Sequence, residues 1–391
     1  MAARYFKLIA GIMAAGISAV SCVYPFNPEI EGADGNLVIE GDILIGKQCT
    51  FNVTYTGSFD SVELSQANAT VWVEDSEGNE YKAASSTKDG PVSIDLTAAP
   101  DDRQYRLHVY NADSGHNYLS EYKQVLKAAD IDSLCYIPDK QKDKLAIGLS
   151  MHTAGSHYFK WSYSEVWEYN AHYYSMYEYI VDNARLQQGH LEPFVNAENV
   201  YYCWNEDESS EIMIFSTADQ TEDRFVDLEF HTIPRSDQRI MYIYYIKVQL
   251  EPMDENGYKY WNNMQQTSDN QGGFFSPTPS QMAGNITCTE DPDEFVHGYI
   301  NVAQVSTDDL FYYNNMVHFY EPSTTYWPET EIVDESEYYT HYMAGYRPIE
   351  EVLDDTTEEV LGISWAPEWC SDCRKSGGTK NKPTWWPSAH I

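Results

Sequence analysis

The residues with the most recognisable chemistry are two cysteines close to the end of the chain. The stretch SWAPEWCSDCRKSGGTKNKPTWWP, residues 364–387, holds Cys370 and Cys373 in the spacing of a thiol–disulfide oxidoreductase. Such an enzyme places its first cysteine at the N-terminus of a helix within a βαβ fold, which lowers the pKa of the thiol. After Cys373 the chain contains Gly377, Gly378 and two prolines, and no βαβ pattern precedes the motif. These surroundings disfavour redox catalysis.

Two other roles remain for this motif. A zinc site needs four ligands, and because one CxxC supplies two, scattered cysteines or histidines would have to complete it. A structural clasp needs only that Cys370 and Cys373 pair with each other or with other cysteines. Gly377 and Gly378 would then allow a sharp turn, and the pair Trp385–Trp386 would anchor the end of the chain. We favour the clasp, and the sequence predicts neither a metal site nor a cofactor.

Other catalytic motifs give no support to an enzyme. The sequence contains no HExxH, GxSxG, P-loop or GxGxxG motif, and its 11 histidines are scattered singly. Glu165 and Glu168, in WSYSEVWEY, have the residue type of a sugar-cleaving carboxylate pair. Residues three apart on a strand point to opposite faces, however, so these two are not expected to act together. The sequence therefore names no catalytic residue and favours a non-enzymatic protein, with a hydrolase as the least favoured class.

The first residues predict export and a lipid anchor. MAARYFKLIAGIMAAGISAVSC has a basic start, then an apolar run from Leu8 to Val20, and ends in small residues and Cys22. A membrane-spanning helix needs about 20 residues, so this shorter run is typical of a signal peptide, residues 1–21. The small residues before Cys22 resemble a bacterial lipobox, which predicts lipidation of Cys22 and attachment to a membrane. Val23 is typical of an outer-membrane address, and residues 22–33 would form a tether.

The composition limits the partners. The chain of 391 residues carries 24 Lys and Arg against 61 Asp and Glu, a formal net charge of −37. Such a charge repels phosphate groups, so we expect no nucleic-acid partner. The 32 tyrosines suit half-buried strands, and they also suit surfaces that bind sugars or peptides.

Short alternating strands dominate the mature chain, so the expected fold class is mainly β. Runs separated by Gly, Asn, Asp, Ser or Pro predict an immunoglobulin-like β-sandwich over residues 34–128. Residues 129–345 predict a second β-rich domain with one inserted helix of three or four turns between residues 251 and 273. The clearest strand of this domain has one apolar face, formed by Ile240, Tyr242, Tyr244, Ile246, Val248 and Leu250. Residues 346–391 are predicted to form an irregular C-terminal tail that holds the CxxC clasp.

Several segments together resemble a known family. They are the lipobox Cys22, YRLHVYNADSGHNYLSEY (105–122), HYFKWSYSEVWEY (157–169), YYCWNE (201–206), RIMYIYYIKVQLEPMDENGYKYWNNMQQ (239–266), GGFFSPTPSQMAGNITC (272–288), PDEFVHGYI (292–300) and WCSDCRKSGGTKNKPTWWP (369–387). In this order they are similar to the Bacteroidota lipoproteins that carry domain of unknown function 4249, over nearly the whole mature chain. The resemblance implies an exported lipoprotein of the kind often encoded beside TonB-dependent outer-membrane receptors. It brings no catalytic residues.

The resemblance leaves the disulfide pairing open. If Cys22 is lipidated, six cysteines remain, an even number that permits full pairing. The preferred expectation is a bridge between Cys203 and Cys288, followed by one between Cys49 and Cys135. The expected function is that of an outer-membrane, lipid-anchored accessory or cargo-binding partner of a TonB-dependent transporter in nutrient uptake. The alternative is an independent cell-surface adhesin or glycan-binding module.

Overall fold

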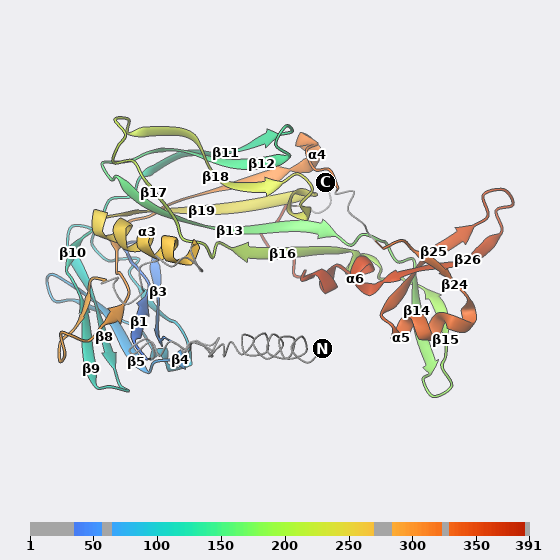
Figure 1. The fold of residues 1–391 in the computed structure, drawn as a ribbon, viewed down its shortest axis with the longest axis horizontal. Coiled ribbons are helices and arrows are strands. Elements are labelled where there is room, and N and C mark those ends of the chain that lie inside the picture. The colour runs from blue at the N-terminus through green and yellow to red at the C-terminus, as the bar shows by residue number, and fades with distance from the viewer. Residues whose placement is uncertain (1–34, 57–64, 270–283, 323–327, 388–391) are drawn as a thin grey trace, which may run out of the picture.

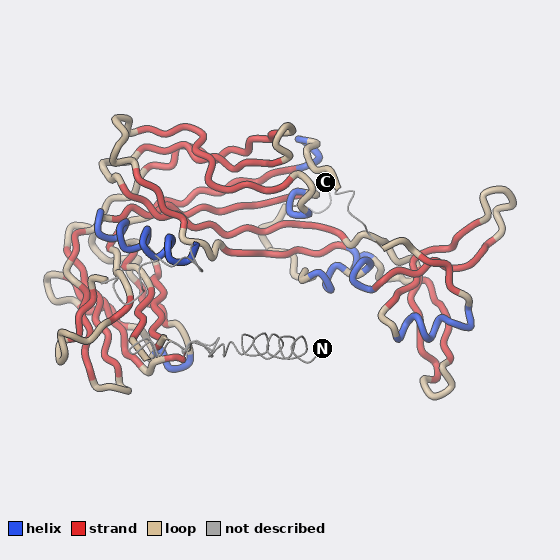
Figure 2. Tube along the Cα trace, viewed as in Figure 1, coloured by secondary structure: helices blue, strands red, loops and turns tan. Residues whose placement is uncertain are grey.

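The computed structural model describes residues 35–56, 65–269, 284–322 and 328–387. The predicted signal peptide, residues 1–21, the tether, residues 22–33, and the lipidation site Cys22 all lie outside these ranges. The fold is mainly β, as the sequence predicts. Three bodies follow one another along the molecule: a β-sandwich at one end, two long central sheets, and a smaller module that projects at the other end (Figures 1 and 2).

The first body confirms the predicted immunoglobulin-like sandwich. Its strands from the N-terminal part of the chain are β1 (Leu37–Glu40), β2 (Ile43–Leu44), β3 (Gln48–Tyr55), β4 (Ser65–Gln66), β5 (Ala69–Asp75), β6 (Glu80–Lys82), β7 (Val92–Asp95), β8 (Gln104–Asn111), β9 (His116–Ser120) and β10 (Lys123–Gln124), with a short helix η1 (Thr87–Asp89). Alternating apolar side chains, such as Phe51 and Val71, are fully buried between the two sheets. The Tyr105 hydroxyl donates to the Pro100 carbonyl, a corner contact typical of immunoglobulin-like domains.

A later part of the chain completes this sandwich, which residues 34–128 do not form alone. The returning segment, residues 286–303, contributes β20 (Ile286–Cys288), β21 (Val296–His297) and β22 (Val302–Ala303). Strand β20 pairs antiparallel with β9, whereas β21 and β22 pair parallel with β1 and β2. Ile286, Ile300 and Val302 join the sandwich core. The predicted boundary missed this segment because parallel pairing between distant strands leaves no turn signal in the sequence.

The central body consists of two sheets packed face to face. The first sheet contains β11 (Asp130–Asp139), β12 (Lys144–His152) and β18 (Arg224–Pro234). The second has the order β16 (Tyr202–Glu208), β13 (Tyr158–Asn170), β19 (Ile243–Met253) and β23 (Ser306–Tyr313), with β17 (Met213–Ser216) also paired to β13. Tyr244, Ile246, Val248 and Leu250 alternate inward from β19 and are fully buried, as predicted. Ile240 instead lies in the short helix η2 (Gln238–Ile240), and Tyr242, which is only partly buried, also precedes the strand.

A buried polar cluster joins the sandwich to the central sheets. Lys160 of β13 forms ion pairs with Asp42, between β1 and β2, and with Glu251 of β19, where Nζ and Oε2 are 3.5 Å apart. Asn301 of the returning segment donates from Nδ2 to Glu251 Oε1 at 2.7 Å. Burial, together with the charge of Asp42, raises the pKa of Glu251 to about 7. The predicted inserted helix is confirmed as α3 (Glu255–Asp269), which follows β19 and packs on the returning segment (Figure 1).

The projecting module gathers two distant stretches around a buried tryptophan. Its elements are β14 (Tyr177–Asn183), β15 (Gln188–Pro193), β24 (Glu331–Val333), η4 (Glu335–Glu337), α5 (Tyr338–Met343), β25 (Tyr346–Leu353) and β26 (Val360–Pro367). Trp365 of β26 is fully buried among tyrosines of β14 and α5. The tail after residue 346 is thus more regular than predicted, because β25 and β26 pair before the irregular part begins. Acidic residues and prolines obscured the alternation of these strands in the sequence.

Candidate functional site: a pocket beside the C-terminal clasp

The CxxC motif lies in a segment that fastens the end of the chain to the central sheets. This C-terminal clasp, residues 368–387, begins with the short helices α6 (Glu368–Ser371) and η5 (Cys373–Ser376). Cys373 forms a disulfide with Cys203 at the start of β16, across a sequence separation of 170 residues. Two backbone hydrogen bonds between Trp204 and Thr379, of 2.9 and 2.8 Å, continue the contact. Because β16 is an edge strand, the clasp covers backbone groups that would otherwise lie at a sheet edge.

A close backbone approach makes this contact possible. The Gly377 φ of 90° reverses the chain, and Gly378 then lies directly against β13 and β16. A Cβ atom at Gly378 would lie 2.4 Å from the Tyr169 hydroxyl and 2.6 Å from Cys203 Cβ. The Tyr169 hydroxyl also donates to the Cys373 carbonyl at 2.7 Å. The two glycines therefore provide the turn that the clasp interpretation requires.

The predicted disulfide pairs are wrong. Cys203 bonds to Cys373 and not to Cys288, while Cys49, Cys135, Cys288 and Cys370 are free thiols. The physical reason is topological: Cys288 lies at the end of β20 in the sandwich, whereas Cys203 lies near the start of β16 in the central sheets. Cys49 and Cys135 are separated in the same way, on β3 and β11.

The environment of Cys370 differs from that of a reactive thiol. Its side chain is buried, and burial raises the pKa of the Cys370 thiol to about 11. An oxidoreductase needs the opposite shift, towards the thiolate. The other member of the motif, Cys373, is already held by Cys203. Of the two cysteines in this CxxC, only Cys373 fastens the chain covalently.

A pocket of about 380 Å³ opens where the clasp meets β16. Val166 and Trp204 line it on the side of the central sheets, and Thr379 and residues 381–385 line it on the side of the clasp. The volume lies in the range of small-molecule sites, which combine apolar walls with a few polar groups. Here the polar groups are supplied by Asn205, Glu206, Asn381 and Lys382. The sequence could not predict this pocket, because its two walls are about 170 residues apart in the chain.

The two tryptophans at the end of the clasp have different roles. Trp386 is 5% exposed, packs with Val166 and Ile243, and donates from Nε1 to Glu168 Oε2 at 3.2 Å. Trp386 alone is therefore the apolar anchor that the sequence predicts for the pair Trp385–Trp386. Trp385 is 51% exposed and lines the pocket, with its ring 4.6 Å from that of Tyr245. A partly exposed indole over a polar-rimmed pocket offers a flat apolar surface for a ligand.

The carboxylates of β13 lie apart, as the strand period predicts. Glu165 accepts hydrogen bonds from Arg239 and Tyr244, both at 2.7 Å. Although burial acts in the opposite direction, the charge of Arg239 and the proximity of His231, whose Nε2 lies 3.4 Å from Glu165 Oε2, lower the pKa of Glu165. Glu168 instead contacts Trp386 of the clasp. The two carboxylates have separate structural partners and do not converge on one site.

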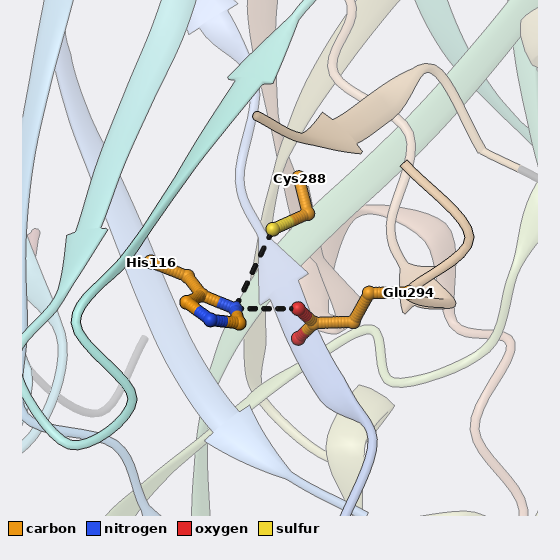
Figure 3. Close-up of side chains that lie close together, drawn as sticks. All are labelled: His116, Cys288 and Glu294. Carbon is orange, nitrogen blue, oxygen red and sulfur yellow. Dashed lines mark hydrogen bonds and ion pairs between the residues drawn. The ribbon is translucent and has the colours of Figure 1, made fainter. Parts of the chain in front are cut away.

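Three side chains that the sequence analysis did not connect meet at the edge of the sandwich (Figure 3). His116 starts β9, Cys288 ends β20, and Glu294 follows in the returning segment. Their donor atoms lie within 4.8 Å of one another, the one such group among the described residues that could hold a metal ion. Burial raises the pKa of the Cys288 thiol. The only local signal was the acidic stretch TEDPDE beside Cys288, since His116 is 172 residues away.

This geometry defines a mainly β protein that has a sandwich, two long central sheets and a pocket beside a disulfide-fastened C-terminal clasp. The family model of domain of unknown function 4249 (DUF4249) matches residues 23–309, and the chain belongs to this family. The match ends before the clasp, so the resemblance of residues 369–387 is not tested by it. None of the curated proteins compared with the chain matches it. None of the described helices has the length and hydrophobicity needed to span a bilayer.

Proposed function

We propose that this protein is an exported lipoprotein of the outer membrane that binds cargo for a TonB-dependent transporter in nutrient uptake. It acts without catalysis, and the membrane contact is a lipid on Cys22. The leader sequence supports export. The Cys203–Cys373 disulfide supports the same compartment, because structural disulfides persist in oxidising environments and are rare in the cytosol.

The observation that carries the cargo-binding part of the proposal is the pocket beside the clasp. It combines an exposed indole, Trp385, with two amides, a carboxylate and an ammonium group at its rim. Flat apolar surfaces flanked by hydrogen-bonding groups suit small polar ligands that have apolar faces, sugars above all. The disulfide holds one wall of this pocket in place, so the site is formed before a ligand arrives.

The projecting module supports the transporter part of the proposal. The hairpin formed by β25 and β26 extends away from the rest of the molecule (Figure 1). It carries Leu353, Val360 and Leu361 near its tip, all about half exposed at 48–57%. Apolar side chains clustered on a protruding hairpin are typical of a protein contact surface. The transporter link itself rests on the family resemblance.

The same pocket also supports the second candidate, a surface adhesin or glycan-binding module that works without a transporter. The two candidates differ in their partner and share the ligand site. Affinity purification from native membranes separates them: we expect a stoichiometric β-barrel receptor to copurify with the full chain. Recovery of the chain alone, under conditions that keep known membrane complexes intact, would favour the independent module.

Ligand binding by the pocket is tested with a matched pair of tryptophans. We expect titration with mono- and oligosaccharides to change the intrinsic fluorescence of the full chain, and Trp385→Ala to abolish the change. Trp369→Ala is the control, because Trp369 is exposed to a similar extent, 47%, and does not line the pocket. Equal loss in both variants, or saturable binding that survives Trp385→Ala, would refute a ligand site at this pocket.

A further inference from the structure

We infer that His116, Cys288 and Glu294 form a Zn²⁺ site that staples the returning segment to the sandwich. One imidazole, one thiolate and one carboxylate are the three ligand types that zinc sites in proteins use. A water molecule would supply the fourth ligand, since the His116 and Glu294 side chains are 33% and 29% exposed and solvent reaches the cluster. The inference is independent of the proposed function, since this cluster lies in the sandwich and the pocket lies on the central sheets.

Two of the three distances between the donor atoms are close to those of tetrahedral coordination, and the third, between Cys288 Sγ and Glu294 Oε2, is within 4.8 Å. With a metal–sulfur bond of about 2.3 Å and a metal–nitrogen bond of about 2.05 Å, tetrahedral angles separate sulfur from nitrogen by about 3.6 Å. Cys288 Sγ and His116 Nδ1 are 3.5 Å apart. The same calculation separates the nitrogen from a carboxylate oxygen by about 3.3 Å. Glu294 Oε2 is 2.8 Å from His116 Nδ1, so this carboxylate has to retreat by only about 0.5 Å to admit the ion.

The cluster converges on one point, which distinguishes it from a catalytic relay. Both the thiol and the carboxylate face the same ring nitrogen of His116, Nδ1 (Figure 3). A nucleophile–histidine–acid triad would place the acid and the nucleophile on the two different ring nitrogens. Cys288 is also only 2% exposed, so its sulfur reaches these two partners better than it reaches a substrate in solvent.

Neighbouring groups already hold the ligands in position. The Asp291 N–H donates to Cys288 Sγ at 3.4 Å, and the Tyr118 hydroxyl donates to Glu294 Oε1 at 2.6 Å. Such outer contacts orient metal ligands and are a regular part of metal sites. Glu294 Oε2 remains directed at His116, and Glu290 Oε2 lies 3.8 Å from the sulfur. The carboxylates around the cluster add a local negative charge that favours a cation.

The expected consequence is structural. His116 lies on β9 and the other two ligands lie on the returning segment, which adds only short strands to the sandwich. A bound Zn²⁺ would therefore fasten this segment, because an ion held by both partners stabilises the folded state by its binding free energy.

The test uses the full chain, purified without a histidine tag, and measures zinc content and zinc affinity. We expect one Zn²⁺ per chain, a stoichiometry that Cys288→Ser, His116→Gln and Glu294→Gln each abolish. Tyr118→Phe, which removes only an orienting contact, should weaken zinc binding by about 10–100-fold. Cys135→Ser is the matched control: Cys135 is also a free thiol beside a carboxylate, with its Sγ 3.3 Å from Asp227 Oδ1, and we expect unchanged binding.

A second measurement needs no variant and so does not depend on the variants folding. Co²⁺ added to the wild-type chain should give an intense thiolate-to-metal absorption and the visible bands of a tetrahedral site. Absence of both signals, or zinc binding that Cys288→Ser leaves intact, would overturn the inference. Zinc binding equally weakened by Cys135→Ser would also overturn it, because it would place the ion elsewhere.

Discussion

Removal of the Cys203–Cys373 disulfide should lower the free energy of unfolding of the central sheets by up to about 5 kcal/mol. The disulfide closes a loop of 170 residues. In the chain-entropy description, a cross-link of this length removes about 17 cal/mol/K from the unfolded chain, which is about 5 kcal/mol at 25 °C. The perturbation is the double change Cys203→Ser and Cys373→Ser, which leaves no unpaired partner for Cys370.

The assay is urea denaturation of the oxidised full chain, followed by tryptophan fluorescence. Because the molecule has three bodies, we expect more than one transition, and the one that involves β16 should move to lower urea. Cys370→Ser is the control, since the buried Cys370 thiol takes no part in the bridge. The Cys370→Ser variant should lose only the packing contacts of this side chain, and peptide mapping should still find the Cys203–Cys373 disulfide.

Two results would refute this reasoning. One is a double variant whose free energy of unfolding lies within about 1 kcal/mol of the wild-type value. This would mean that the loop is already ordered in the unfolded chain, or that the bridge is strained in the folded protein. The other is peptide mapping that joins Cys370 to Cys373 or to Cys203. The CxxC would then be a local disulfide, and the clasp would lose its covalent basis.

Three further outcomes are expected. Glu251→Gln should remove a pH dependence of the free energy of unfolding. Because the pKa of Glu251 is raised to about 7, its stabilising contribution is fully present below pH 4.5 and is lost as the pH rises through about 7, which amounts to up to about 3 kcal/mol. Thermal unfolding of wild type and variant at a series of pH values measures this difference, and parallel curves would contradict the role of Glu251. Trp386→Ala should lower the free energy of unfolding, measured in urea, by about 3–5 kcal/mol, whereas Trp385→Ala should lower it far less. Similar losses in the two variants would contradict the assignment of Trp386 as the anchor and Trp385 as a pocket residue. Gly378→Ala should destabilise the clasp by about 1–3 kcal/mol, because the new Cβ meets the Tyr169 hydroxyl, and an unchanged urea midpoint would show that the clasp can shift.

The sequence by itself determined those features that repeat locally. The alternation of β19, the helix α3 between a proline-acidic start and a Gly–Gly end, and the mainly β fold class all follow from short-range patterns. The Gly377–Gly378 turn is also local, because a turn acts on its own neighbours, whereas the partners of the Trp386 anchor lie far away in the chain.

Only the tertiary structure decided which distant segments meet. The sequence left the partner of Cys203 open and favoured Cys288, whereas the actual pairing with Cys373 depends on the clasp lying along the β16 edge. The returning segment, residues 286–303, joins the sandwich through parallel pairs with β1 and β2, and this brings Cys288 and Glu294 to His116. Such contacts are made by packing between residues far apart in the chain. Periodicity and spacing report the face on which a side chain lies, but not which strand will cover that face.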